Sequence, residues 1–244
     1  TILHSWDRLN EALEFAFSFS RSHRIIVEEF IEKKHEYLIG GDIFVNDGKI
    51  IIWGLLNCHR DNSVNPLVPV GKSYPLLLDE TDEKAVHDTL QTMIDKLGLK
   101  FGSVNVEIVI DKNNKVWPID VGPRAGGNMI PDLLGMIFDV DVVELSVLTA
   151  MGEIPDIRVK RGSPFYATHN LHTSHNGKYR AIEFSDELKT KVIKKCLYKK
   201  TGDNVEYFDN AAKALGIIFM KFNNQEEMNS ILGNINEYYK VVVE

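Results

Sequence analysis

The sequence predicts an α+β protein in which an antiparallel sheet is flanked by helices and followed by a small second α+β domain. Three observations predict this fold. Apolar and β-branched runs are joined by short turn signals, among them Asp47-Gly48 and Asn176-Gly177. Separate segments carry apolar residues at helical spacing. A short stretch with a proline, residues 154–156, divides the two groups of elements and predicts a linker.

The composition bounds the class of protein. With 244 residues, of which 44% are hydrophobic, the chain can bury a sizeable core. A net charge of −7 argues against broad binding to nucleic acids or anionic membranes, and no apolar run is long enough to span a bilayer. The two cysteines, Cys58 and Cys196, match no metal or redox spacing, so we expect a cytoplasmic protein and a buried thiol at residue 58.

The first elements follow from local patterns. Apolar residues at helical spacing predict a helix from Ser5 to about Ser20, and a strand is predicted over residues 25–29. A hairpin over residues 37–45 and 49–56 is predicted because Asp47-Gly48 is the strongest short hairpin signal. This turn would also place His59 near Glu36, as a surface pair or as part of a ligand site.

The polar segment after residue 56 contains three prolines and shows no periodicity. Loops of this length are uncommon unless they bind a ligand or move, so we expect a long loop with substrate contacts here. A helix is predicted next over residues 82–97, and Gly98 is the residue expected to end it. Two further helices are predicted over residues 130–138 and 142–151.

An acidic hairpin lies between these helices. The runs VNVEIVI and VWPIDVG flank residues 111–115, a cluster of types that tolerate tight turns. If the turn is centred on its Asn-Asn pair, Glu107 lies opposite Asp120 and Asn105 lies opposite Gly122, all on one face. The other face is predicted to be an apolar core surface formed by Val104, Val106, Ile108, Ile110, Trp117, Ile119 and Val121.

The two opposed carboxylates call for a positive partner. Directly opposed residues of an antiparallel pair have Cβ atoms about 5 Å apart, and like charges there are destabilising. A hard divalent cation, which prefers oxygen ligands, or the guanidinium of Arg124 could lie between them. A solvated face of an amphipathic hairpin is the alternative.

The second domain is predicted to begin with a hairpin over residues 165–173 and 178–184, turning at Asn176-Gly177. Its remaining elements are, in order, a helix over residues 186–198, a strand over 215–222 and a helix over 225–238.

Three histidines near the start of this domain raise the question of a zinc site. On a strand, His169 and His175 would face one way and His172 the other. Since zinc needs its ligands on one side, we expect no common metal site among them.

The order of parts resembles the ATP-grasp superfamily, the ATP-dependent carboxylate-amine ligases and their relatives. Three motifs carry the resemblance: IIVEEFIEKKHE, VNVEIVI and WPIDVGPRAGGN. The likeness covers about the first 155 residues well and the remainder loosely. It implies a remnant of the lid and hinge over residues 1–31, a catalytic lobe over 32–155 and an accessory domain over 156–244. The chain would then begin just past the family's lid loop, without the N-terminal domain and the lid lysines.

The resemblance also implies nucleotide contacts in the first motif. Glu28 and the main chain of Glu29, Phe30 and Ile31 would hold the adenine, and Glu36 would accept hydrogen bonds from the ribose hydroxyls. Taken alone, these glutamates could equally be a solvated charge run before a hairpin.

The other two motifs imply a phosphate site. By resemblance, Glu107 and Asp120 would hold Mg²⁺ or Mn²⁺ on ATP, and Arg124 would hold the phosphoryl group or a substrate carboxylate. The alternative role for Arg124 is an ion pair with the same acids. The family usually has Asn where Gly122 stands. Asn105, or else Asn128, could supply the amide oxygen instead.

The implied activity is phosphorylation of a carboxylate by MgATP, giving an acyl phosphate that an amine or similar nucleophile attacks. The implied substrates are a small carboxylate and a small amine. We expect no nucleic-acid or membrane partner, and the apolar helix surfaces are compatible with a homodimer. Three alternatives stay open: a binding module of this fold without turnover, a carboxylase-like or kinase-like relative, and an interaction domain whose acids only pair with Arg124. The chain by itself is expected to be a poor catalyst.

Overall fold

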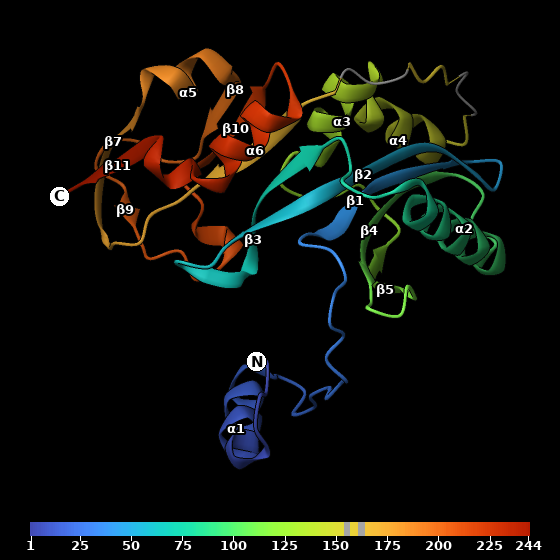
Figure 1. The fold of residues 1–244 in the computed structure, drawn as a ribbon, viewed down its shortest axis with the longest axis horizontal. Coiled ribbons are helices and arrows are strands. Elements are labelled where there is room, and N and C mark those ends of the chain that lie inside the picture. The colour runs from blue at the N-terminus through green and yellow to red at the C-terminus, as the bar shows by residue number, and fades with distance from the viewer. Residues whose placement is uncertain (154–156, 161–163) are drawn as a thin grey trace.

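The computed structural model describes residues 1–153, 157–160 and 164–244. The predicted class is confirmed, because within these residues helices flank a large antiparallel sheet (Figure 1). Its eight strands lie in the order β5-β4-β1-β2-β3-β6-β10-β8. Their bounds are β1 Leu38–Asn46, β2 Lys49–Asp61, β3 Asn65–Tyr74, β4 Gly102–Ile110, β5 Val116–Gly122, β6 Tyr166–Leu171, β8 Val192–Leu197 and β10 Gly216–Lys221.

A smaller sheet of order β11-β7-β9 accompanies the large one in the C-terminal part. Its strands are β7 Gly177–Phe184, β9 Asn204–Val205 and β11 Tyr239–Val243. The helices are α1 Leu9–Phe19, α2 Glu80–Leu97, α3 Ile130–Phe138, α4 Val142–Ala150, α5 Asp186–Lys191 and α6 Gln225–Gly233, with short 3₁₀ turns η1 Trp6–Arg8, η2 Ala211–Lys213 and η3 Ile235–Glu237.

Local sequence explains the elements that were predicted correctly. Asp47 and Gly48 both adopt positive φ, 46° and 75°, which is what a two-residue turn between twisted strands requires. Asp79 caps α2 by accepting a hydrogen bond from the amide of Asp82, and Gly98 ends this helix at a φ of 67°. The predicted hairpin over β1 and β2 and the predicted helices α2, α3 and α4 are therefore confirmed.

The two faces of the large sheet are covered by different helices. Val86, Leu90 and Ile94 of α2 pack on the side chains of one face. Helices α3 and α4 pack on the opposite face with Phe44, Ile52, Leu56, Ile217 and Phe219. Helix α3 covers only part of that second face. The part formed by β1, β4 and β5 carries the polar residues of the acidic hairpin.

The acidic hairpin has the predicted pairing at its acids but not at its apolar residues. Glu107 lies opposite Asp120, whereas Ile108 lies opposite Pro118, because a β-bulge at Ile119 shifts the register by one residue. The bulge places Trp117 opposite Val109, on the acidic side, and leaves Ile119 52% exposed. The prediction that Trp117 and Ile119 join the core was therefore wrong.

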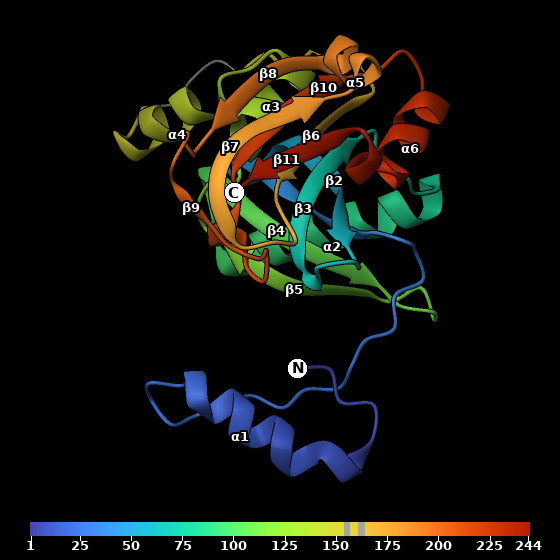
Figure 2. The same ribbon diagram turned by 90° about the vertical axis from the view of Figure 1, so that its left-hand side faces the viewer.

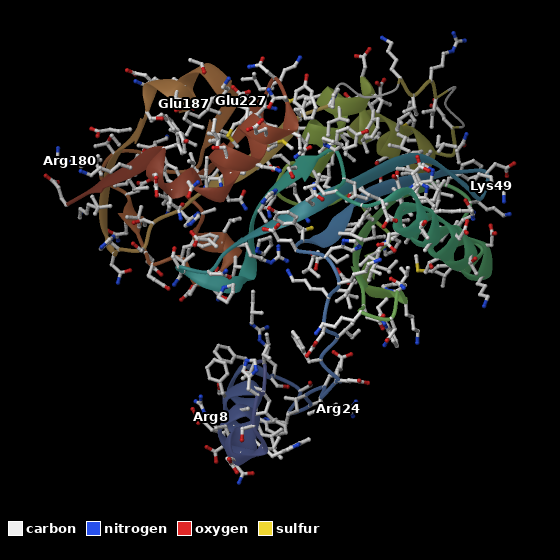
Figure 3. The ribbon with its side chains drawn as sticks, in the orientation of Figure 1. Arg8, Arg24, Lys49, Arg180, Glu187 and Glu227 are labelled. Atoms are coloured by element: carbon white, nitrogen blue, oxygen red, sulfur yellow. The ribbon has the colours of Figure 1, made fainter. Side chains whose placement is uncertain are left out.

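The N-terminal segment contains the predicted helix, as η1 followed by α1, but not the predicted strand. Residues 25–29 form no strand, and α1 lies apart from the body at the end of an extended segment (Figures 1 and 2). Arg8 and Arg24 mark this projecting part in Figure 3. The β-branched run at residues 25–27 predicted a strand, but no neighbouring strand pairs with it among the described residues. A strand needs a hydrogen-bonded partner as well as suitable residues.

The expected loop after residue 56 is instead the end of β2 followed by β3. β-Bulges beside Arg60 interrupt the regular pairing of β2 with β3. Pro69, which has no N–H to donate, is therefore accommodated opposite Arg60. Further along, β3 pairs with β6, so the large sheet runs on into the C-terminal part. The predicted linker at 154–156 lies outside the described residues, and the division of the chain near residue 155 stays a prediction.

The C-terminal predictions were right about strand β10 and wrong about three other elements. Strands β6 and β7 do not form a hairpin, because both edges of β6 are taken by β3 and β10 while β7 pairs with β11 and β9. The predicted helix over 186–198 ends at Lys191 and continues as β8, whose burial alternates with period two. The predicted helix over 225–238 ends at Gly233 and leads into β11.

The histidines lie differently from the alternation expected of a strand. Because β6 ends at Leu171, His172 is free to turn toward His169, and their ring centroids are 5.3 Å apart. Both rings are buried, whereas His175 is exposed. His172 Nε2 lies 2.9 Å from Asp61 Oδ2, and His169 Nε2 lies 3.2 Å from the Tyr239 hydroxyl. These four residues, of which only Asp61 is partly exposed, form a cluster that is called the histidine cluster below.

Candidate functional site

The candidate site lies on the face of the large sheet where β4, β5 and β1 meet. Glu107 of β4 is paired directly with Asp120 of β5 on one side and with Gly40 of β1 on the other. One step along, Asn105 is paired with Gly122 and with Asp42 in the same way. Since residues paired across strands point to the same face, these polar side chains share one surface.

The two opposed carboxylates have little compensating charge from the protein. Asp120 is exposed and neither hydrogen-bonds nor ion-pairs with any described residue. Arg60 Nη2 lies 4.0 Å from Glu107 Oε1, at the outer limit of an ion pair. Within the described chain, the negative charge of this pair therefore faces solvent mostly uncompensated.

Arg124 does not neutralise the acids. Its Nη1 donates to the carbonyl of Ala125 at 2.9 Å, and it forms no ion pair with Glu107 or Asp120 among the described residues. A Cβ added at Gly122 would lie 3.6–3.8 Å from Cγ, Nε and Cζ of Arg124. The guanidinium therefore lies over the position where a side chain at residue 122 would stand, and its remaining donors are available to an anion.

The donor set fits Mg²⁺ held mainly by a nucleotide. No group of three or more His, Cys, Asp or Glu side chains in the described residues is placed to hold a metal by itself. Mg²⁺, however, is usually bound by one or two carboxylates together with substrate phosphates and waters. An opposed Glu–Asp pair without a protein cation between its members meets that need. The metal roles of Glu107, Asp120 and Asn105 stay predictions.

Asp42 is a site residue that the sequence analysis missed. Its side chain is buried, and its two oxygens accept hydrogen bonds from the Asn105 side-chain amide and the Gly126 main chain, both at 2.8 Å. Burial raises the pKa of Asp42 above its ordinary value, and these two hydrogen bonds oppose that rise. An acid inside the apolar run LIGGDIFV was the signal that could have revealed it.

Gly126 is required where the loop after β5 returns to the sheet. A Cβ at this residue would lie 2.6 Å from Asp42 Oδ1 and 2.7 Å from Asn105 Nδ2. Only glycine permits that approach, which anchors the loop carrying Arg124 to the strands that carry the acids. Asn105 Nδ2 also donates to the carbonyl of Gly41 at 3.0 Å, so its orientation is held by two acceptors.

The polar segment expected to be a loop supplies basic and neutral groups to the same region. His59 Nε2 lies 2.8 Å from Ser73 Oγ, and its ring contacts Tyr37 rather than Glu36, so the predicted His–Glu pair is wrong. Burial, with the nearby charges of Lys72 and Arg60, lowers the pKa of His59 to about 4. Lys72 itself is buried, with its Nζ 2.7 Å from Cys58 Sγ.

The residues predicted to hold adenine lie on the extended segment between α1 and β1. Glu28, Glu29, Phe30 and Glu36 are exposed, and Ile31 is partly buried. Two main-chain contacts, Lys33 with Asp111 and Lys34 N with Ile110 O, attach the end of this segment to the turn of the acidic hairpin. Burial, with the charge and a hydrogen bond of Glu36, raises the pKa of Tyr37 to about 12. Adenine binding stays a prediction.

This fold and site define a class. A family model described as an ATP-grasp domain matches residues 2–132, which is more than half of the chain. The chain belongs to the ATP-grasp family. It is 39% identical over 112 residues to the uncharacterized protein y4rH of Sinorhizobium fredii, covering 45% of this chain and 22% of that protein. The chain therefore spans about a fifth of the length of this curated relative.

Solved structures share the fold. The phosphoribosylglycinamide synthetase of Anaerococcus prevotii superposes with a TM-score of 0.75 at 20% identity, over 98% of this chain and 61% of that one. The L-amino acid ligase of Bacillus licheniformis superposes with a TM-score of 0.74 at 15% identity, over 88% of this chain and 53% of that one. A third structure is the biotin carboxylase domain of the Hydrogenobacter thermophilus 2-oxoglutarate carboxylase, in complex with MgADP and bicarbonate. It superposes with a TM-score of 0.64 at 13% identity, over 97% of this chain and 52% of that one.

The described residues include no helix that is both long enough and apolar enough to cross a membrane.

Proposed function

We propose that this chain is the part of an ATP-dependent ligase that binds the phosphates of ATP with Mg²⁺ or Mn²⁺ and activates a small carboxylate for attack by an amine. The observation that carries the proposal is the direct pairing of Glu107 with Asp120 on a shared, solvent-facing surface beside Arg124. Membership of the ATP-grasp family and the MgADP complex of a similarly folded carboxylase domain support it.

The chain's own residues would bind and orient the reacting groups. A divalent ion supplies charge neutralisation at the phosphates when it is bound. Glu107 and Asp120 would hold that ion from two adjacent strands, whose pairing fixes the separation of the carboxylates. Arg124, placed by the Gly126 loop, would donate hydrogen bonds to the transferring phosphoryl group. Most of the catalytic effect would then come from positioning and electrostatic stabilisation.

The proposed reaction has two steps. A carboxylate oxygen attacks the γ-phosphorus of ATP, the bond to the bridging oxygen of ADP breaks, and an acyl phosphate and ADP form. An amine nitrogen then attacks the acyl carbon and loses a proton, and inorganic phosphate leaves with the electrons of the carbon–oxygen bond. The bond formed is carbon–nitrogen.

Calorimetric titration tests the metal and nucleotide part of the proposal. The chain is titrated with a nonhydrolysable ATP analogue with and without Mg²⁺, beside the double variant Glu107→Gln, Asp120→Asn. We expect metal-dependent binding that the double variant loses by about 100-fold, or roughly 3 kcal/mol. Asp47→Asn, at an exposed turn of the same sheet, is the control and should bind like the parent. Equal binding by the double variant and the parent would refute the proposed site.

One observation favours a second function, a nucleotide-binding module without turnover. Residue 122 offers no side-chain oxygen, and Arg124 covers its place. The two functions separate when phosphate release is measured with a panel of carboxylates and amines. Release that requires both substrates identifies the ligase, whereas metal-dependent nucleotide binding without release under any pair identifies the silent module.

A further inference from the structure

Cys58 and Lys72 form a buried pair of a thiol and an amine that the site described so far does not use. They lie directly opposite each other on β2 and β3, and Lys72 Nζ is 2.7 Å from Cys58 Sγ. Cys58 is 2% exposed and Lys72 is 7% exposed. The sequence predicted only a buried thiol at residue 58, because its contact with a lysine 14 residues away depends on the pairing of two strands.

The two reactive atoms are held unusually close together. Hydrogen bonds from N–H to oxygen span about 2.7–3.2 Å, and sulfur is a larger acceptor than oxygen. The separation of Nζ and Sγ therefore lies at the short limit even for the smaller acceptor. A Cβ at Gly40 of β1 would lie 2.7 Å from Sγ and 2.9 Å from Nζ, so the missing side chain there leaves the space that the pair occupies.

The amine has no better partner than the thiol. Sγ of Cys58 is the one hydrogen-bond acceptor of Lys72 Nζ among the described residues, and no described carboxylate lies within 4.0 Å of Nζ. A thiol is a weak acceptor, whereas a thiolate is a nucleophile whose negative charge a neighbouring ammonium stabilises. The environment therefore favours chemistry at this thiol.

The second cysteine of the chain lacks this arrangement. Cys196 of β8 is only partly buried, and no hydrogen bond of the described residues joins its Sγ to a lysine amine. Lys194 of the same strand donates to Asp132 instead. The chain thus carries one paired thiol and one lone thiol, and the lone thiol is the more exposed of the two.

The pair lies next to groups that are open to solvent. Gly40, against which both side chains rest, is paired with Glu107, whose side chain is 30% exposed. Hydrogen peroxide is little larger than water, so it can approach the thiol from this face of the sheet.

We propose that Cys58 and Lys72 are an oxidation site at which hydrogen peroxide joins Sγ to Nζ in a sulfenamide, a reversible cross-link. The Cys58 thiolate attacks one oxygen of the peroxide, so that an S–O bond forms and the O–O bond breaks. The hydroxide that leaves takes a proton from the Lys72 ammonium and becomes water. A sulfenic acid then stands beside a neutral amine.

The cross-link closes in a second step. Nζ of Lys72 attacks Sγ of Cys58, the S–O bond breaks with its electrons on oxygen, and this oxygen leaves as a second water with a proton from Nζ. The sulfur has lost two electrons, which the peroxide has gained. A thiol reductant that attacks the sulfur returns the thiol and the amine. Oxidation therefore exchanges an ammonium for a neutral nitrogen on the face that carries Glu107, and reduction restores it.

Mass spectrometry of the peroxide-treated chain tests the cross-link. The folded chain is treated with hydrogen peroxide, the remaining thiols are blocked with iodoacetamide, and proteolytic peptides are analysed with and without dithiothreitol. We expect the Cys58 and Lys72 peptides to be joined, with a mass lower by two hydrogen atoms than the sum of the separate peptides. Dithiothreitol should release them. The urea-unfolded chain should not form this link, because only the fold brings the two atoms together.

Variants separate the pair from other thiols and amines. The link should be lost in Cys58→Ser and in Lys72→Met, and it should be kept in Cys196→Ser. Lys49→Met, at a surface lysine whose side chain is 70% exposed and which is labelled in Figure 3, is the matched control and should also keep it.

A further variant keeps both reactive groups and moves them apart. Gly40→Ala places a methyl group against Sγ and Nζ, so the rate of cross-linking should fall by about 10-fold. Thermal unfolding of every variant shows which of them are folded. If Lys72→Met is unfolded, Gly40→Ala and the peptide map of the parent still decide the question.

The remaining outcomes overturn the inference. Oxygen added to Cys58 without a link to Lys72 would show that the amine does not trap the sulfenic acid. A link that keeps an oxygen atom would contradict the second step, which expels it. Oxidation of Cys196 with Cys58 unchanged would show that peroxide does not reach the pair. The inference is independent of the proposed function, because the link is detected whether or not the chain binds a nucleotide.

Discussion

Two polar clusters on the same sheet differ in how their charges are satisfied. In the histidine cluster, the partly buried Asp61 accepts hydrogen bonds from the buried His172 and from Ser63 and Asn236 at the surface. In the acidic hairpin, Asp120 faces solvent, paired across strands with another acid, Glu107. The first cluster holds protein segments together, whereas the second leaves charge available to a ligand.

Structural acids and candidate ligand-binding acids are distinguished by whether the protein itself compensates their charge. Hydrogen-bonded buried groups stabilise the fold, and removing one partner leaves the others unsatisfied. Two like charges that face each other across neighbouring strands destabilise the folded state slightly. Such a pair is expected where a bound ligand needs both charges. The same change, a carboxylate to a carboxamide, should therefore have opposite effects on stability in the two clusters.

The largest effect is expected from Asp61→Asn. The amide nitrogen would face a donor from His172, Ser63 or Asn236, so the free energy of unfolding should fall by about 3 kcal/mol. Urea unfolding at pH 7 measures it. Asp47→Asn at the exposed β1–β2 turn is the control, since asparagine tolerates the φ of 46° found there. Equal stabilities for the two variants would show that the hydrogen bonds of Asp61 contribute no more than an exposed turn residue does.

Gly126→Ala tests the loop that links Asp42 to Arg124. The added methyl group would meet Asp42 Oδ1 at 2.6 Å, so we expect a loss of about 2 kcal/mol in the free energy of unfolding. At the next residue, Gly127→Ala meets no atom within 4 Å and should be near neutral. Thermal unfolding of the pair gives the comparison, and a larger loss at residue 127 would contradict the observed geometry.

The pH dependence of stability tests the buried His59. Its pKa in the folded protein, about 4, lies below the value of about 6.5 in an unfolded chain, because burial disfavours the charged ring. Between those values the unfolded chain binds more protons, so stability falls as the pH decreases from about 6.5 toward 4. At pH 5.5 this loss should be about 1 kcal/mol relative to pH 8.

His59→Gln should flatten this slope, since glutamine does not titrate and can still bond to Ser73. Urea unfolding across the pH range measures both proteins. Parallel curves for parent and variant would show that another group controls acid sensitivity in this range.

The smallest effect is expected from Asp120→Asn in the absence of ligand. Removing one of two opposed charges should raise the free energy of unfolding by about 0.5 kcal/mol, opposite in sign to Asp61→Asn. Urea unfolding with a metal chelator present measures it. Destabilisation by more than 1 kcal/mol would mean that Asp120 makes structural contacts and that the two clusters are alike.

Much of the N-terminal half could be predicted from short patterns. The turn Asp47-Gly48, the cap of α2 at Gly98 and the pairing of Glu107 with Asp120 depend on residues within about 20 positions of one another. The pairing was correct only because the bulge at Ile119 offset an error of one residue at the turn. A bulge leaves no clear local signal, so Trp117 was assigned to the wrong face.

The reversal at Asp47-Gly48 and the helices α2, α3 and α4 follow from the sequence, because turn dihedrals and periodicity are properties of neighbouring residues. The pairing of Glu107 with Asp120 depends in addition on the bulge at Ile119. Three outcomes depend instead on the assembled fold: β6 joins β3 rather than β7, Asp42 is satisfied by Asn105 and Gly126, and Lys72 reaches Gly40 beside Glu107. Those outcomes depend on which distant strands and loops meet, and on the burial of each polar group once they have met.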